Sequence, residues 1–287
     1  MIVDLHCHST ASDGLLAPAE VVARAAGQGV ALLALTDHDT TTGLPEAAEA
    51  ARRLGMGFVP GIEISTTWSH GTVHIVGLDI DPDHPRLRQG LEQLAEERAR
   101  RAEVMIQRLA RLGIVGAEAA IPGDPRAAGR SHFARWLVDQ GHAKDWRQAF
   151  KRYLGRGKPA YVPGRWATLA EAVEWIRSAG GVAVLAHPAR YRLTHSKLTR
   201  LLTDFRTVGG TALEVVSSSH SEDDRRCMAQ LAGRFALWAS AGSDFHGPGG
   251  FVELGRDLTL PRGCRPLWSR WRDRLSNPEN TCQVSPS

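Results

Sequence analysis

Hydrophobic and polar residues follow two alternating patterns along this chain. The run Val30–Leu35 is continuously apolar, which is typical of a strand buried on both faces. The segment before it begins at Pro18 and carries apolar residues at helical spacing until Gly27. A second such segment covers 44–54, and a strand over 57–62 follows, ending in a glutamate. This alternation of buried strand and amphipathic helix predicts a parallel α/β fold.

The same alternation returns in the last third of the chain. We expect a hairpin and a long, charged helix between the two α/β regions. The predicted hairpin arms are 64–67 and 72–78, the long helix is 86–111, the later helices are 169–179, 197–208 and 223–233, and the later strands are 181–186, 213–216 and 237–241.

Residues 113–164 break this rhythm. Turns rich in glycine and proline, at 121–125 and 155–159, frame short helical segments. We interpret this stretch as a small helical insertion. The predicted organisation is therefore an α/β domain whose first part is 1–112 and whose second part is 165–287.

Composition limits the classes of protein that fit. The 287 residues can form one barrel-sized domain or two ordinary ones, and the net charge is +4. Many arginines and lysines lie between residues 98 and 165; they either form a surface for a phosphate-bearing partner or a solvated helical face. Four scattered cysteines and no secretory segment predict a reduced, cytoplasmic protein. No apolar run of about 18 residues exists, so we expect no membrane partner, and no feature indicates an obligate protein partner.

Histidines and carboxylates recur where the predicted strands end. His6 and His8 are two apart on the first strand, so their side chains point to one face. In α/β barrels the carboxyl ends of the strands meet at a common mouth. A single buried histidine is more often a core residue, but this many at one rim predict a metal site. The candidate ligands are His6, His8, Asp13, His38, Glu63, His74, His187, Asp244 and His246.

The mixture of imidazole and carboxylate indicates the metal. It suits Mn²⁺, Zn²⁺ or Fe²⁺ better than a soft thiolate site would. The set exceeds what one ion binds, so we expect two or three ions. Asp13 has an alternative interpretation, because Ser12-Asp13-Gly14 is also good turn chemistry.

Five short motifs resemble those of the PHP (polymerase and histidinol phosphatase) family, in the same order over most of the chain. They are His6-Cys7-His8, Thr36-Asp37-His38-Asp39, Gly61-Ile62-Glu63, Ala186-His187-Pro188 and Gly242-Ser243-Asp244-Phe245-His246. The run Gly-Arg-Ser-His-Phe-Ala-Arg at 129–135 is similar to the TrpH-like branch, which acts on nucleoside 3',5'-bisphosphates and on short RNA from the 5' end.

The resemblance implies a distorted (β/α)7 barrel with a trinuclear centre. One ion would be held by His6, His8, Glu63 and Asp244, a second by Glu63, His74 and His187, and a third by Asp13, His38 and His246. The nucleophile would be a metal-bound hydroxide held through Glu63, His6, His8 and His187. Many relatives carry histidine where this chain has Asp13, and an oxygen ligand there favours Mn²⁺, with Zn²⁺ or Fe²⁺ as alternatives.

A site rich in positive charge suits in-line attack on phosphorus. The general acid for the leaving group is not identified; Asp37, a candidate, is expected instead to orient a ligand histidine. Arginine guanidinium groups near the start of a helix can bind a second phosphate through paired hydrogen bonds. The predicted substrate-binding residues are Arg130, Ser131, His132, Arg135 and Lys158.

The predicted function is removal of the 3'-phosphate from nucleoside 3',5'-bisphosphates, with trimming of short RNA from the 5' end as an additional activity. Three alternatives remain. The chain could be a phosphatase of a simpler monoester such as histidinol phosphate, a non-catalytic PHP module, or a metal-dependent amidohydrolase that shares the initial His-x-His.

Overall fold

The computed structural model describes residues 1–69, 71–121 and 123–271. The chain forms two compact units. The first combines Met1–Gly90 with the described residues from Ala167 onward, and the second is Leu91–Trp166. The predicted insertion, 113–164, lies inside the second unit, which also takes most of the long helix before it.

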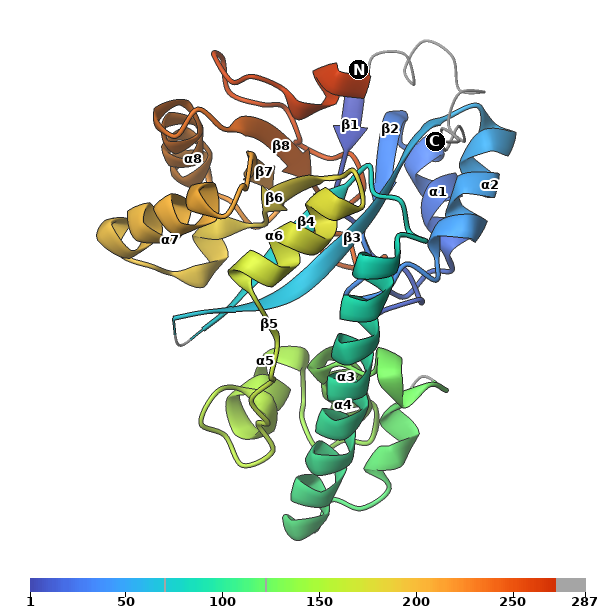
Figure 1. Cartoon of the computed structure of the whole chain (residues 1–287). Helices are drawn as coiled ribbons and strands as arrows, with labels where there is room; N and C mark the ends of the chain where they lie inside the picture. The colour runs from blue at the N-terminus through green and yellow to red at the C-terminus, as the bar shows by residue number, and fades with distance from the viewer. Residues whose placement is uncertain (70, 122, 272–287) are drawn as a thin grey trace. The chain divides into compact units, whose positions relative to one another are not determined.

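A single sheet forms the first unit, and its strands follow the order β1-β2-β3-β4-β6-β7-β8, with β5 paired to β3 (Figure 1). All neighbours pair in parallel except β4, which is antiparallel to β3 and to β6. The strands are β1 (Ile2–Asp4), β2 (Val30–Leu35), β3 (Gly57–Trp68), β4 (Gly71–Leu78), β5 (Ala167–Thr168), β6 (Val182–Leu185), β7 (Ala212–Ser217) and β8 (Trp238–Gly242).

The first and last strands meet, which nearly closes the sheet into a barrel. The N–H of Leu5 donates to the carbonyl of Ala241 at 3.0 Å, and Cys7 pairs in parallel with Phe245. The predicted α/β barrel with a helical insertion is therefore confirmed. Its seven-strand path, with one reversed strand, is the distortion that the resemblance implied.

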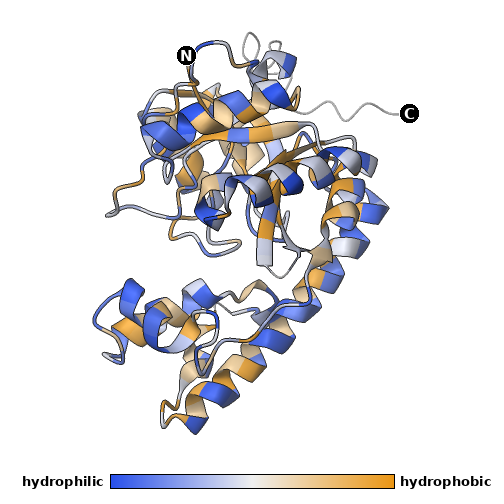
Figure 2. Cartoon of the chain, turned by 90° about the vertical axis from the view of Figure 1, so that its left-hand side faces the viewer, coloured by the Kyte–Doolittle hydropathy of each residue, from blue (hydrophilic) through white to orange (hydrophobic). Residues whose placement is uncertain are grey.

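The helices of the first unit form where the sequence supplies starts and stops. Proline stands at the start of α1 and of α2, where a missing N–H costs nothing, and Gly55 ends α2 at φ 63°. In Figure 2 the helices carry both hydrophilic and hydrophobic residues, as expected of helices with one buried face. They are α1 (Pro18–Gly27), α2 (Leu44–Leu54), α6 (Leu169–Ser178), α7 (His195–Thr207) and α8 (Glu222–Arg234), with short 3₁₀ turns at η4 (Pro188–Tyr191) and η5 (Leu267–Trp271).

Alternate residues of neighbouring strands form one buried cluster. It includes Leu32 and Ala34 of β2, Val59 of β3 and Val76 of β4. Because side chains two apart share a face, the next positions of the same parity also point to this side of the sheet. The register thereby directs Glu63, His74 and Glu214 toward the same side as the barrel core.

One strand prediction is wrong. We expected a strand over 57–62 that ends at Glu63, followed by a separate hairpin arm over 64–67; instead β3 is continuous and Glu63 lies in its middle. The first half of β3 pairs with β2 and the second half with β4, so one long strand changes partners near Pro60. A switch of partner leaves no trace in hydrophobic periodicity.

The second unit has its own core. Met105 and Leu109 of α3 (Pro85–Arg111) belong to the same buried cluster as Phe133 and Leu137 of α4. This packing explains why the unit includes part of the long helix. Its other elements are η1 (Ala117–Ala120), η2 (Pro125–Ala127), α4 (Arg130–Asp139), α5 (Trp146–Ala149) and the π-turn η3 (Phe150–Leu154).

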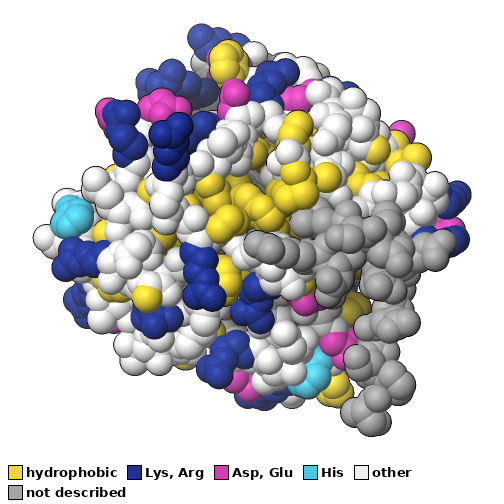
Figure 3. Space-filling model, turned by 90° about the horizontal axis from the view of Figure 1, so that it is seen from above, with side chains coloured by type: hydrophobic (Ala, Val, Ile, Leu, Met, Phe, Trp, Pro, Cys, Tyr) yellow, Lys and Arg dark blue, Asp and Glu magenta, His cyan; other side chains and the backbone are white. Residues whose placement is uncertain are grey.

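Within the described residues, every helix is too short or too polar to cross a bilayer. Cys7, Cys227 and Cys264 are free thiols, and Cys282 lies outside the described residues. The face on which β1 begins, seen from above in Figure 3, carries scattered arginines and lysines around an apolar centre and few histidines.

Candidate metal centre

His6 and His8 follow β1 and extend its pairing with the segment after β8. The N–H of His8 donates to the carbonyl of Phe245 at 2.8 Å, and the N–H of Asp244 donates to the carbonyl of His6 at 2.8 Å. This extended pairing keeps the two histidine rings on one side, with centroids 5.2 Å apart. The shared side agrees with the strand parity of the two residues, and both side chains are also buried.

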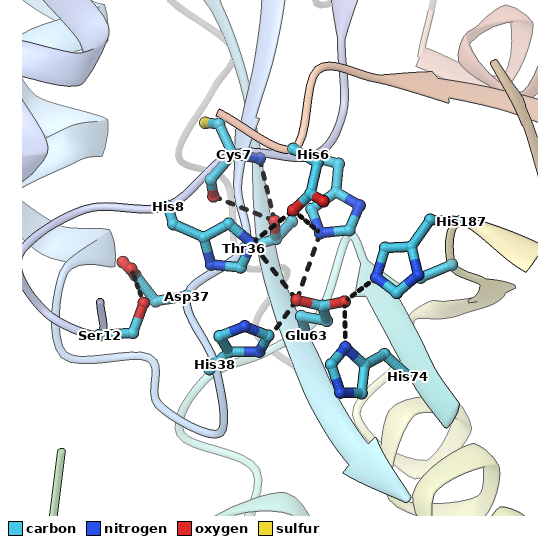
Figure 4. Close-up of polar contacts among 12 residues, drawn as sticks. His6, Cys7, His8, Ser12, Thr36, Asp37, His38, Glu63, His74 and His187 are labelled. Carbon is cyan, nitrogen blue, oxygen red and sulfur yellow. Dashed lines mark hydrogen bonds and ion pairs between the residues drawn. The ribbon is translucent and has the colours of Figure 1, made fainter. Parts of the chain in front are cut away.

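Glu63 is the centre of the cluster (Figure 4). Its Oε2 lies 3.3 Å from Nε2 of His6 and 3.3 Å from Nε2 of His8. Its Oε1 lies 2.8 Å from Nδ1 of His74 and 2.9 Å from Nε2 of His187. A fully buried carboxylate thus faces histidines from three segments of the barrel.

Two further carboxylates complete the centre. Oδ1 of Asp244 lies 3.3 Å from Nε2 of His8, and Oδ1 of Asp13 lies 3.3 Å from Nε2 of His246. His38 bridges the groups, because its Nδ1 is 2.9 Å from Glu63 and its Nε2 is 4.0 Å from Asp13.

All nine predicted ligands therefore come together. Three sets have ligand atoms within 4.8 Å of one another: His6, His8, Glu63 and Asp244; His8, Asp13, His38 and His246; and His38, Glu63 and His74. The first set equals the predicted one. The second set adds His8 to the predicted ligands. The third has His38 where His187 was predicted, although Nε2 of His187 still lies 2.9 Å from Oε1 of Glu63.

The residues fit a metal. Among the described residues, Nε2 of His6, Nε2 of His8 and Nδ1 of His38 form no hydrogen bond, although all three are buried. Burying such atoms without partners is costly, and divalent ions satisfy them. His187 at φ 27° and Asp244 at φ 57° also occupy backbone conformations that non-glycine residues rarely adopt, and such strain concentrates at functional sites.

The ionisation of the carboxylates and histidines also fits a metal site. Burial opposes ionisation, but His38, His74 and His6 hold the pKa of Glu63 well below its usual range. Burial also disfavours the charged form of His8, yet the carboxylates of Asp244 and Glu63, each 3.3 Å from its Nε2, raise its pKa to about 10. In the absence of an ion, protons on histidine thus balance the carboxylates, and a divalent cation can replace them.

The proposed role of Asp37 is wrong. Its carboxylate accepts hydrogen bonds from the N–H and the hydroxyl of Ser9, both at 2.7 Å, and from the hydroxyl of Ser12 at 2.5 Å. Asp37 therefore fixes the loop that leads to Asp13 rather than a histidine ring. The sequence signal for this role is the presence of Ser9 and Ser12, three residues apart, in the loop that leads to Asp13.

Two residues of the centre were missed. Glu214 lies in β7 and accepts a hydrogen bond from His6; its signal was a lone charge inside the apolar run 212–216. Arg190, on η4, pairs with Oδ2 of Asp244 while about half of its side chain is exposed. Its position three residues after His187 is the sequence signal for it.

In the second unit, Arg130 begins α4 as predicted, and its guanidinium carbon lies 5.6 Å from the centroid of the Phe150 ring. Nδ1 of His132 accepts a hydrogen bond from the N–H of Gly129 at 3.0 Å, so this predicted substrate residue caps the helix. Ser131 and Arg135 are partly buried, and Lys158 is exposed.

Two buried arginines of α3 join Arg130. Arg98 and Arg101 lie with their guanidinium carbons 5.5 Å and 4.7 Å from the ring centroid of Trp166. Burial and then the charges of Arg98 and Arg130 lower the pKa of Arg101 to about 10. The neighbouring carboxylate, Glu97, accepts two hydrogen bonds from the guanidinium of Arg100. A concentration of buried positive charge is the chemistry of an anion site. Because α3 carries many arginines, its sequence did not show that Arg98 and Arg101 are buried whereas others are exposed.

Comparison with known proteins is consistent with this geometry. The PHP domain model matches residues 4–115. A relative from Chromobacterium violaceum named 3',5'-nucleoside bisphosphate phosphatase is 49% identical over 96% of this chain and 98% of its own. A relative from Salmonella typhimurium named 5'-3' exoribonuclease Rnm is 46% identical over 94% of each chain.

A solved structure from Chromobacterium violaceum has the same fold, with a TM-score of 0.93 and 48% identity over 98% of this chain and all of the other. It is described as an amidohydrolase with bound sulfate and no metal. Sequence identity of nearly one half over almost the whole chain agrees with the geometry of the cluster. The chain therefore belongs to the PHP family.

Proposed function

We propose that this protein is a metal-dependent phosphatase that converts nucleoside 3',5'-bisphosphates to nucleoside 5'-monophosphates and phosphate. The observation that carries the proposal is the convergence of Glu63, Asp13 and Asp244 with six histidines in one largely buried cluster. The relative named 3',5'-nucleoside bisphosphate phosphatase supports the substrate.

The ions would supply the activated nucleophile and neutralise charge on the phosphoryl group. The protein's part is to hold them: Glu63 lies where its two oxygens can serve different ions, and Asp244 offers Oδ1 to the cluster while Arg190 binds Oδ2. The half-exposed guanidinium of Arg190 leaves donors for a phosphoryl oxygen.

We propose Mn²⁺ as the metal, in two or three ions. Three carboxylates make the centre harder than an all-histidine site, which favours Mn²⁺ over Zn²⁺. Metal analysis of the purified protein tests this proposal. Stoichiometric Zn²⁺ or Fe²⁺ in the protein would contradict the assignment of Mn²⁺. The free thiols of Cys7, Cys227 and Cys264 agree with a reducing, cytoplasmic location, which stays a prediction.

The second phosphate would bind the basic cluster of the second unit. The buried guanidiniums of Arg98 and Arg101 interact with the partly buried Arg130, and the N-terminus of α4 adds backbone donors. Ser131, His132, Arg135 and Lys158 remain proposed contributors. The same site would accept the 5'-phosphate of short RNA, an additional activity that the relative named 5'-3' exoribonuclease Rnm supports.

The test is phosphate release with Mn²⁺ from 3',5'-adenosine bisphosphate, 3'-AMP, histidinol phosphate and a short 5'-phosphorylated RNA. We expect the bisphosphate to be preferred, and Arg130→Ala to raise its KM without altering turnover of 3'-AMP. Arg156→Ala, an exposed arginine of the same unit, is the matched control.

Other outcomes would favour the alternatives. Equal rates on the bisphosphate and on histidinol phosphate would favour a simple monoesterase. Turnover of amides without turnover of phosphoesters would favour an amidohydrolase. Absence of bound metal and of any turnover would favour a non-catalytic module.

A further inference from the structure

Glu214 is a buried carboxylate to which no role has been given. It lies in β7 with only 2% of its surface exposed, on the parity that directs Ala212 into the barrel core. Gly242 of β8 leaves room for it, because a Cβ there would overlap His6 and lie 2.9 Å from Oε1 of Glu214. The site is therefore built around this side chain.

The first oxygen of Glu214 fixes the ring of His6. Oε1 lies 3.0 Å from Nδ1 of His6. Because a carboxylate accepts hydrogen bonds and does not donate them, the proton of this pair belongs to Nδ1. The lone pair of Nε2 then points to the opposite side of the ring, where Oε2 of Glu63 lies 3.3 Å away and Oδ1 of Asp244 3.6 Å away. That is the side on which an ion is expected.

The second oxygen fixes the backbone of another proposed ligand. Oε2 accepts a hydrogen bond from the N–H of His187 at 2.5 Å. His187 has φ 27°, a strained conformation that persists only where the surroundings hold it. The same residue presents Nε2 to Oε1 of Glu63 at 2.9 Å.

We propose that Glu214 is a positioning residue that couples two metal positions, through the ring of His6 at one and the backbone of His187 at the other. This inference rests on the metal-dependent function proposed above. A carboxylate bound to the far nitrogen of a ligand histidine strengthens metal binding, and its loss lowers metal affinity about 10–100-fold. Since one side chain holds both ligands, its loss should weaken both positions together.

Glu214→Gln is the sharpest variant because an amide has one acceptor and one donor. If its oxygen accepts from the N–H of His187, its NH₂ must donate to Nδ1 of His6. The proton of His6 then moves to Nε2, the nitrogen that would bind the ion. The substitution keeps the shape of the side chain while reversing the tautomer of His6.

Metal binding is measured by titrating the apoprotein with Mn²⁺ and by elemental analysis after dialysis, and the melting temperature of the apoprotein is recorded alongside. We expect Glu214→Gln to bind Mn²⁺ about 10–100-fold more weakly, with an apoprotein melting temperature near that of the wild type. In a His6→Gln background, the additional effect of Glu214→Gln should shrink, because part of its action passes through His6.

Glu253→Gln is the matched control, since this largely buried glutamate of the same unit pairs with Arg24 and is no proposed ligand. It should retain wild-type affinity. Wild-type affinity in Glu214→Gln, or a lower apoprotein melting temperature with unchanged metal affinity, would overturn the inference. If the wild type itself binds no metal, it is the proposed function that fails.

Discussion

The Oε2 atom of Glu63 lies 2.9 Å from Nδ1 of His38, and this contact links two sets of candidate ligands across the neighbouring strands β2 and β3. Glu63 belongs to the set around His6 and His8, whereas His38 also belongs to the set around Asp13. The carboxylate in the middle of β3 thus contacts five of the candidate histidines: His6, His8, His38, His74 and His187.

Glu63→Gln should remove activity more completely than any change outside the ligand set. The amide nitrogen is not a metal ligand and leaves the surrounding histidines without their charge partner. We expect kcat/KM to fall more than the about 10–100-fold of an outer residue, together with loss of bound metal. Elemental analysis and phosphate release measure both effects. Full metal content with full activity would remove Glu63 from the centre.

Asp13→His should change the preference among metals. Oδ1 of Asp13 lies 3.3 Å from Nε2 of His246, so an imidazole would replace a hard oxygen with a softer nitrogen. We expect the ratio of activity with Mn²⁺ to activity with Zn²⁺ to fall in the variant. Asp83→His, at an exposed aspartate, is the control. An unchanged ratio in Asp13→His would favour the alternative that Asp13 only shapes its turn.

Phosphate should stabilise the protein through the buried arginines of the second unit. We expect the melting temperature to rise with phosphate in the wild type, since a ligand of the folded state adds about 2.7 kcal/mol at a hundredfold excess over Kd. Arg101→Met should reduce this rise, whereas Arg111→Met, at the exposed end of α3, should not. The same rise in Arg101→Met as in the wild type would argue against an anion site there.

Thr168 should stabilise α6 through its cap. Its hydroxyl accepts a hydrogen bond from the N–H of Glu171 at 3.2 Å, and Oε2 of Glu171 accepts one from the N–H of Thr168 at 2.7 Å. Thr168→Ala should cost about 1 kcal/mol, or about 2–4 °C in melting temperature. Thr207→Ala, within the last turn of α7, is the control and should change stability by less than about 0.5 kcal/mol.

The ion pair between Arg24 and Glu253 should make the free energy of unfolding depend on pH in the acidic range. Two hydrogen bonds join them, at 2.9 Å and 2.5 Å, and the bond from Arg24 lowers the pKa of Glu253. Because the folded pKa lies below the unfolded value of about 4.3, the stabilisation is present above that pH and is lost as pH falls through the folded pKa. Arg24→Met should therefore unfold at lower urea than the wild type at pH 7, and the gap should narrow in acid. A gap that stays constant would contradict the linkage.

The sequence alone determined the alternation of strands and helices and the identity of the candidate ligands. Hydrophobic periodicity places β2, α1 and α2 at their observed bounds, because burial on one or two faces imposes a period that the chain itself carries. The ligands were recoverable because each follows or interrupts an apolar strand with a residue that has no reason to be buried there.

Tertiary structure decided everything that depends on partners distant in the chain. Periodicity reports which face of a strand is buried but not its neighbours, so the continuity of β3 through Glu63 and its change from β2 to β4 were invisible. For the same reason the grouping of His38 with Glu63, the hydrogen bond from His6 to Glu214, and the clustering of Arg98 and Arg101 became visible only in the tertiary structure. The residue types at the site can be read from short stretches of sequence, whereas their arrangement in space depends on packing between distant segments.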